Sequence, residues 1–185
     1  MEKELLDFCR VKKIFDKGFG FLSSINYSQD VFFHFSKIKD EKVKEELQKL
    51  KRGVVYIYYT SQAENNKRKV FRMWLSLKNV PDYLIPQFKS KIIDELNDGK
   101  TNVFELAHII KELRSYDQIE PEELKQILLS HKIQSNPSVV IKILSDEEIN
   151  QYEDINSYFN NIHDKKVGKD IWISEVLNKL IKHQF

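Results

Sequence analysis

Short runs in the first eighty residues alternate hydrophobic with polar side chains, which is the pattern of β-strands. Five such runs are rich in aromatic and β-branched residues, the types that favour strands, and polar segments separate them. The runs span residues 8–15, 19–25, 30–36, 53–60 and 68–77. We therefore expect five strands, with a tight turn at 26–29 between the second and third and a polar loop at 61–67 between the last two.

A helical period appears between the third and fourth strands and again after Pro81. Val43, Leu47 and Leu50 recur at helical spacing, which predicts a short helix over 39–51 that ends before Gly53. Beyond Pro81 the pattern is helical throughout, with capping signals such as Asn102, Pro121 and Ser145 at the helix starts. About six helices are predicted, over residues 83–97, 102–115, 121–131, 137–144, 145–162 and 169–183.

The charge of the chain is unevenly distributed between these two parts. Residues 1–80 contain 17 Lys and Arg against 10 Asp and Glu, whereas residues 81–185 contain 13 against 18, so the overall charge of +2 conceals halves of +7 and −5. A basic half attracts anionic polymers and an acidic half repels them. We therefore predict two domains: a nucleic-acid-binding domain over 1–80 and an all-helical domain over 81–185 that docks a partner.

Two aromatic runs dominate the basic half. Lys17-Gly18-Phe19-Gly20-Phe21 is followed ten residues later by Val31-Phe32-Phe33-His34-Phe35. Successive side chains of a strand point to opposite faces, so Phe19 and Phe21 share one face and Phe32 lies opposite Phe33. At least one aromatic ring from each strand must then face solvent unless both faces of the sheet are buried. Exposed rings among lysines indicate a platform on which bases stack.

These two runs, followed by a glycine before an apolar strand, resemble the cold-shock domain over residues 8–77. The resemblance implies an N-terminal five-stranded antiparallel β-barrel of the oligonucleotide-binding fold, so that the whole chain is α+β. It also implies that aromatic side chains of the two motifs stack on successive bases of single-stranded RNA or DNA. The positions that match the nucleic-acid-binding residues are Lys17, Phe19, Phe21, Asp30, Phe32, His34 and Phe35, and we add Lys12 and Lys13 as phosphate contacts.

The chain departs from the cold-shock pattern in two places. The tryptophan usual in the first strand is replaced by Lys13 or Ile14, which implies one stacking partner fewer. The aromatic, glycine-rich loop after the second motif is replaced by the charged segment 39–51. The basic triplet Lys67-Arg68-Lys69 has two interpretations, a solvated turn or a phosphate contact. Taken singly, Phe21 and Phe35 also fit ordinary core positions.

The sequence contains few features that indicate catalysis or cofactor binding. The histidines of the helical half are scattered without the spacing of a metal site, and neither a glycine-rich phosphate loop nor a Ser-His-Asp motif is visible. Acidic residues near Glu122 and Glu147 fit the favourable charge at a helix start. The one cysteine, Cys9, leaves no internal disulfide to form. We expect no enzyme activity, no metal and no cofactor.

We expect a soluble, cytoplasmic protein, because no apolar run approaches the ~18 residues of a membrane span. The favoured function is binding of single-stranded nucleic acid, RNA in preference to DNA, as an RNA chaperone, translation regulator or ribosome-associated factor. The helical domain would then recruit a protein or the ribosome. The alternative is a protein-interaction factor in which the barrel is a scaffold and the helical domain carries the partner site.

Overall fold

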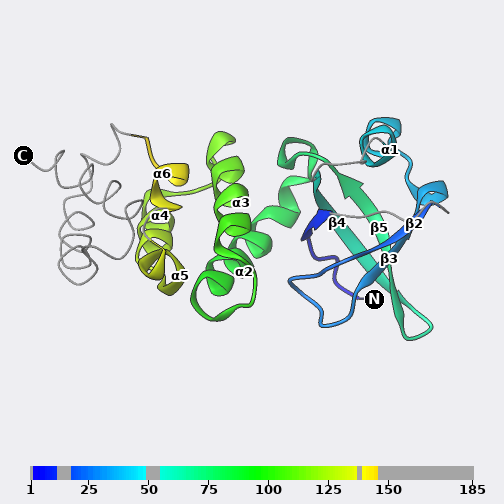
Figure 1. Ribbon diagram of the computed structural model, residues 1–185, viewed down its shortest axis with the longest axis horizontal. Coiled ribbons are helices and arrows are strands. Elements are labelled where there is room, and N and C mark those ends of the chain that lie inside the picture. The colour runs from blue at the N-terminus through cyan, green and yellow to red at the C-terminus, as the bar shows by residue number, and fades with distance from the viewer. Residues whose placement is uncertain (1, 12–17, 49–54, 137–138, 146–185) are drawn as a thin grey trace, which may run out of the picture. The chain divides into compact units, whose positions relative to one another are not determined.

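The computed structural model describes residues 2–11, 18–48, 55–136 and 139–145 (Figure 1). The chain divides into two compact units, residues 1–92 and 93–185, with the boundary inside one helix. The helices predicted over 145–162 and 169–183 lie outside the described residues, except for Ser145 itself.

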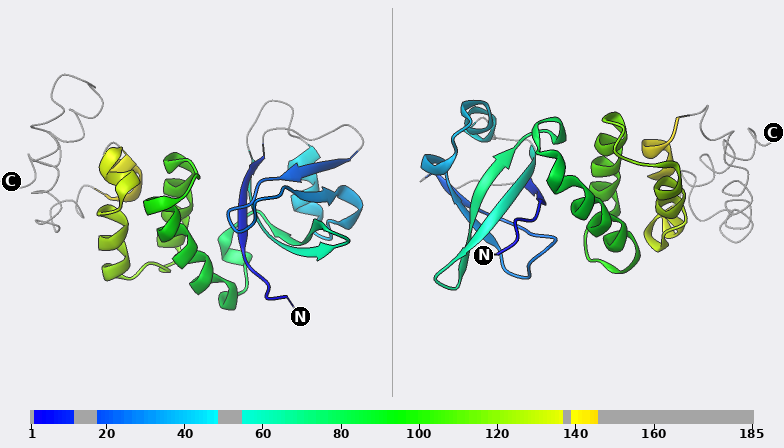
Figure 2. Two further views of the ribbon diagram at one scale, coloured as in Figure 1. Left: turned by 90° about the horizontal axis from the view of Figure 1, so that it is seen from below. Right: turned by 180° about the vertical axis from the view of Figure 1, so that it is seen from behind.

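The first unit is built on a five-stranded curled sheet, visible from two sides in Figure 2. Its hydrogen-bonded order is β1-β4-β5-β3-β2. The pairs β1–β4, β4–β5 and β2–β3 are antiparallel, as expected, whereas β3 and β5 run parallel. The strands are β1 (Asp7–Val11), β2 (Phe19–Leu22), β3 (Val31–His34), β4 (Val55–Glu64) and β5 (Lys67–Trp74).

Alternating side chains of these strands fill the core on the concave face of the sheet. The helix predicted over 39–51 is present as α1 (Glu41–Gln48), and its Leu47 is buried in the same core. Buried aliphatic and aromatic side chains from all of β1 to β4 meet there, with Val70 and Met73 of β5 packed against them. The buried members are Cys9, Val11, Leu22, Val31, Phe33, Ile38, Leu47, Ile57 and Tyr59.

The opposite face of β1 and β4 is also buried, under the start of the helical segment. Phe8 and Tyr58 are register partners that point away from the core, and their ring centroids lie 5.5 Å apart. Phe88 of α2 (Ile85–Asp98) is buried and packs edge-on against Tyr58 at 6.0 Å. This side of the sheet is therefore covered by protein, which leaves β2, β3 and β5 to present an outward face.

The last two strands form a longer hairpin than the sequence predicts. The segment 61–67 was expected to be a loop, but β4 continues to Glu64 and β5 begins at Lys67. Asn65 and Asn66 make the whole turn, with φ values of 49° and 63°. Two consecutive residues with positive φ close a two-residue hairpin whose twist matches the flanking strands. Of the polar residues before them, Gln62 and Glu64 are exposed, whereas Ser61 is buried.

The connection between β2 and β3 is a loop over 23–30 rather than the expected tight turn at 26–29. A buried carboxylate holds it: Asp7 of β1 accepts hydrogen bonds from the Ile25 N–H at 2.8 Å and from the Ser24 hydroxyl. The Asn26 amide donates to the Leu6 carbonyl at 2.8 Å, and the Tyr59 hydroxyl donates to the Ser23 carbonyl at 2.6 Å. These bonds fix the loop and hence the two strands that it joins.

Burial gives Asp7 a testable pH dependence. Desolvation raises its pKa above the ordinary value, although hydrogen bonds from Ser24, Ile25 and Phe8 oppose the shift. The folded state therefore holds this proton more tightly than the unfolded state, so the Asp7 contribution to stability falls as pH rises through the window between the two pKa values. We expect Asp7→Asn to be stabilised relative to the parent as pH rises above about 4, the ordinary pKa of an aspartic acid. Urea unfolding at several pH values measures this, and a constant difference in unfolding free energy would contradict it.

The second unit contains short helices, as the helical period after Pro81 predicts. The helix predicted at 102–115 is α3 (Val103–Ser115), capped by the Asn102 side chain, which accepts from the Phe104 N–H at 2.8 Å. The helix predicted over 121–131 is interrupted, because the Ser130 hydroxyl donates back to the Ile127 carbonyl at 2.5 Å where the first segment ends. The remaining helices are α4 (Pro121–Leu128), α5 (His131–Ser135) and α6 (Val140–Ile143). Across the described ranges, no helix combines the length and apolar character needed to cross a membrane.

Candidate nucleic-acid interface

The register between β2 and β3 separates the two aromatic runs into an outward and an inward set. Phe21 pairs with Phe32 and Phe19 pairs with His34, and all four side chains point outward. The intervening pairs, Gly20 with Phe33 and Leu22 with Val31, face the core. The expectation that Phe32 and Phe33 lie on opposite faces is therefore confirmed.

Three outward rings form what we call the aromatic cluster: Phe19, Phe21 and Phe32. Ring centroids lie 5.9 Å apart for Phe19 and Phe32, 5.6 Å for Phe21 and Phe32, and 6.3 Å for Phe19 and Phe21. The interplanar angles range from 32° to 90°, so the rings present both edges and faces. Phe21 is 53% exposed, and the other two are partly exposed. Exposure of a large apolar side chain is the less common outcome for phenylalanine, and three adjacent rings that are partly or largely exposed make this face a candidate binding surface.

His34 extends the cluster with a hydrogen-bonding group. Its Nδ1 accepts from the Ser36 N–H at 3.0 Å and lies 2.7 Å from the Ser36 hydroxyl, because His34 caps the short turn Phe35–Lys37. In the neutral ring, the proton must then reside on Nε2. His34 thus offers a fixed, flat ring with an N–H donor directed away from the turn, which suits stacking and a hydrogen bond to a base.

Phe35 occupies a different environment from the aromatic cluster. It packs against the core, and its ring lies edge-on to Phe33 at 6.0 Å between centroids. Its N–H donates to the Gly18 carbonyl at 2.8 Å, and Gly18 has a φ of +78° that side-chain-bearing residues rarely adopt. Only part of the Phe35 ring is exposed, so its role in binding stays a prediction.

Gly20 serves the core rather than the outward face. A side chain at this position would point inward, toward Phe33. A Cβ atom there would lie 2.6 Å from Cε1 of Phe33, closer than packed atoms can approach. Gly20 therefore makes room for the Phe33 ring, and the aromatic cluster depends on it only through the shape of the strand.

The structure describes only some of the charged residues that the sequence predicts for the interface. Lys12, Lys13 and Lys17 lie outside the described residues. Asp30 is exposed in the loop just before β3.

The basic triplet at 67–69 divides into separate environments. Arg68 is buried and forms an ion pair with Glu2 at 2.7 Å. Its guanidinium also donates to the Ser61 hydroxyl at 3.1 Å and lies 3.5 Å above the centroid of the Tyr27 ring. Arg68 is a structural residue, whereas Lys67 and Lys69 are exposed. Lys69 is the register partner of Phe32, so a cation stands beside the aromatic cluster.

One exposed aromatic residue on the same strand escapes sequence reasoning. Phe71 of β5 is 51% exposed, on the same face as the exposed Lys67 and Lys69, as the alternation of a strand requires. The ladder between β4 and β5 shifts register at Thr60 and Ser61, and Phe71 has no partner in it. This β-bulge shifts the alternation after Phe71, so that Met73 rather than Arg72 packs on the core. The signals for Phe71 in the sequence are the strand alternation and the two basic residues that flank Val70-Phe71, Lys69 and Arg72.

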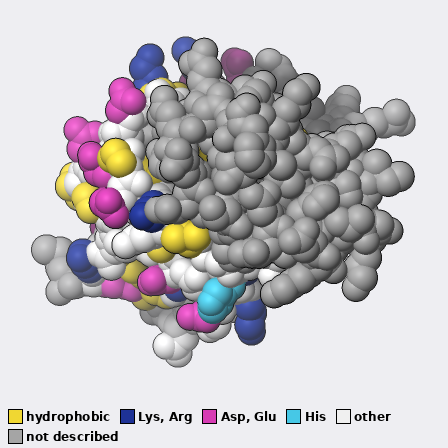
Figure 3. Space-filling model, turned by 90° about the vertical axis from the view of Figure 1, so that its left-hand side faces the viewer, with side chains coloured by type: hydrophobic (Ala, Val, Ile, Leu, Met, Phe, Trp, Pro, Cys, Tyr) yellow, Lys and Arg dark blue, Asp and Glu magenta, His cyan; other side chains and the backbone are white. Residues whose placement is uncertain are grey.

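Groups capable of other chemistry are dispersed. Within the described ranges, no three His, Cys, Asp or Glu side chains gather as metal ligands would. Glu123 accepts from the Glu120 N–H at 3.0 Å, as a capping residue does at a helix start. On the described part of the surface that Figure 3 draws, Asp and Glu side chains lie beside Lys, Arg and hydrophobic side chains.

The comparisons with known proteins agree with this geometry. No curated protein and no solved structure matches the chain. A family model does match: residues 9–71 match the 'Cold-shock' DNA-binding domain. This segment contains β2, β3, β4 and most of β1 and β5, together with the whole aromatic cluster. The curled sheet of the first unit is therefore a cold-shock domain of the oligonucleotide-binding fold, which supports nucleic-acid binding by this part of the chain.

Proposed function

We propose that this protein binds single-stranded nucleic acid, RNA in preference to DNA, and that bases stack on the aromatic cluster of β2 and β3. The observation that carries the proposal is the outward trio Phe19, Phe21 and Phe32, which packs ring against ring at 5.6–6.3 Å and still exposes Phe21 by 53%. Every base has a π face, so such a surface accepts any sequence, and each stacked base contributes about 1–3 kcal/mol.

The expected mechanism combines stacking with neutralised phosphates. Lys69 stands next to Phe32, and we predict that Lys12, Lys13 and Lys17 add further phosphate contacts. Each phosphate neutralised on a single strand releases about 0.7 counterion, so affinity should fall as salt rises. His34 would donate from Nε2 to a base. No covalent step is proposed: the protein acts as a binding factor in the cytoplasm, as an RNA chaperone, translation regulator or ribosome-associated factor.

A titration of the full chain tests this function. Labelled uridine-rich RNA, thymidine-rich DNA of equal length and a duplex of the same length are compared at two salt concentrations. We expect both single strands to bind, RNA more tightly, with weaker binding at higher salt, and the duplex to bind far less, because its bases are not available for stacking. Equal binding of the duplex and the single strands would contradict the stacking mechanism.

A second candidate function rests on the other unit. Phe104 of α3 is 48% exposed, and the Lys142 ammonium lies 4.8 Å from its ring centroid. An exposed aromatic residue on the helical unit fits a protein partner site, with the barrel as a scaffold. This alternative predicts an association that survives nuclease treatment and Phe19→Ala but is lost in Phe104→Ala. A pull-down with the parent, Phe19→Ala and Phe104→Ala, each with and without nuclease, distinguishes the two functions.

A further inference from the structure

The outward face of β5 carries a second group of exposed side chains. Val70 and Met73 both pack against the core, so the bulge leaves the two residues between them, Phe71 and Arg72, turned outward together. Phe71 is half exposed and is not among the described side chains that pack against the core. An exposed ring has meaning for binding when it extends a contiguous apolar patch, because such patches mark interaction sites.

This group is continuous with the aromatic cluster. β5 is hydrogen-bonded to β3, and Lys69 is the register partner of Phe32. Phe71 follows two residues after Lys69 on the same strand. A path across the sheet from β2 to β5 therefore meets Phe21, Phe32, Lys69 and then Phe71. Lys69 forms an exposed ion pair with Glu64 at 3.1 Å, and exposed pairs of this kind are weak enough for a phosphate to replace the carboxylate.

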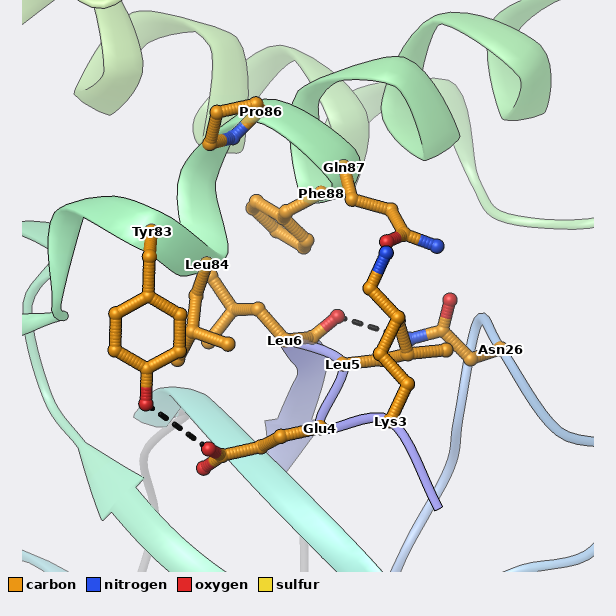
Figure 4. A pocket seen from close by; sticks show the side chains of 10 residues that line it. All are labelled: Lys3, Glu4, Leu5, Leu6, Asn26, Tyr83, Leu84, Pro86, Gln87 and Phe88. Atoms are coloured by element: carbon orange, nitrogen blue, oxygen red, sulfur yellow. Dashed lines mark hydrogen bonds between the residues drawn. The ribbon is translucent and has the colours of Figure 1, made fainter. Parts of the chain in front are cut away.

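Arg72 holds the far end of this surface in place. Its guanidinium carbon lies 5.9 Å from the Phe71 ring centroid, 5.1 Å from that of Trp74 and 5.9 Å from that of Tyr83. Glu4 pairs with Arg72 at 2.7 Å and accepts a hydrogen bond from the Tyr83 hydroxyl at 3.0 Å (Figure 4). Because Glu4 and Tyr83 fix the guanidinium, the rings around it are preorganised and lose little entropy when a ligand binds.

We propose that a single strand bound on the aromatic cluster continues across β3 onto β5, where a further base stacks on Phe71 and its phosphate contacts Lys69. This inference rests on the proposed function and extends its binding site by one β-strand, β5. A nucleic acid fits this surface because the cations Lys69 and Arg72 flank the ring along β5, and Lys69 is also the register partner of Phe32 in the aromatic cluster. The extra position also compensates for the tryptophan that the first strand lacks.

The test measures affinity against strand length with the full chain. Labelled oligouridylates from about four to about ten nucleotides lie within the range that one oligonucleotide-binding fold covers. The variants are Phe71→Ala, Phe71→Trp, which keeps a stacking ring, and Phe32→Ala. Phe104→Ala is the matched control, because Phe104 is equally exposed and also lies next to a cation, but in the other unit.

We expect Phe71→Ala to match the parent on the shortest strands and to bind the longest about five- to a hundredfold more weakly, whereas Phe71→Trp follows the parent throughout. Phe32→Ala should lose affinity at every length. Parent-like binding by Phe71→Ala at all lengths would overturn the inference and leave a protein contact as the role of this ring. An equal loss at every length would overturn it too, because Phe71 would not then lie at an extension. If the parent binds no strand, the proposed function fails as well.

Discussion

Replacing Phe32 with alanine is expected to weaken binding of single-stranded RNA by about five- to 150-fold, the equivalent of one lost stacking partner worth about 1–3 kcal/mol. Phe32 has the largest expected effect in the interface because its ring makes the two shortest contacts of the aromatic cluster, at 5.6 and 5.9 Å, and neighbours Lys69. Its side chain is outside the core, so the free energy of unfolding should change little. Fluorescence anisotropy with labelled RNA gives the affinity, and urea unfolding gives the stability.

The matched control for this prediction is again Phe104→Ala, which removes an exposed phenylalanine from α3. It should leave RNA affinity at the parent value. If the two variants bind equally well, the aromatic cluster does not stack on bases, and the phenylalanines of β2 and β3 have another role.

Replacing the adjacent Phe33 with alanine is expected to produce the opposite pair of effects. Phe33 is only 3% exposed and lies in the centre of the barrel core. Loss of a buried phenylalanine typically lowers the free energy of unfolding by about 3–5 kcal/mol, because a cavity remains where the ring was. We expect a loss of this size in urea unfolding, and RNA binding should follow only the fraction of protein that stays folded.

The close approach of Gly20 to Phe33 sharpens this second prediction. Gly20→Ala alone should be destabilising, because the new methyl group overlaps the Phe33 ring. In the double variant with Phe33→Ala, the methyl group instead enters the vacated space. The double variant should therefore lose less stability than the sum of the two single losses. Additive losses would show that the two residues do not compete for the same volume.

The alternation of side chains in a strand made the aromatic face predictable from sequence. Phe19, Phe21 and Phe32 follow from the period of two and from the resemblance to cold-shock domains, and the register between β2 and β3 places them together as expected. The core position of Phe33 follows from the same argument. The α+β class, the helix between the third and fourth strands and the N-cap of α3 were equally readable, because each depends on local periodicity or capping.

Features that depend on contacts between residues far apart in the chain could not be predicted from the sequence. Arg68 belongs to a basic triplet in sequence, yet Glu2, Ser61 and Tyr27 surround it in the fold. Asp7 resembles any polar strand residue until the loop at 23–30 closes over it with hydrogen bonds. Arg72 is turned outward beside Phe71 by a bulge in the ladder, and a single irregular residue leaves no periodic signal. In each case a contact between residues far apart in the chain overrides the local pattern.

Photocrosslinking of 4-thiouridine-containing single-stranded RNA to the full chain, followed by mass spectrometry of the crosslinked peptides, tests the central claim most directly. Stacked thiouridine reacts with the aromatic side chain beneath it, so the crosslinked residue reports the binding surface without any substitution. We predict crosslinks to Phe19, Phe21 or Phe32 that an excess of unlabelled single strand abolishes. Crosslinks confined to residues beyond 92 would contradict the claim that RNA binds the aromatic cluster.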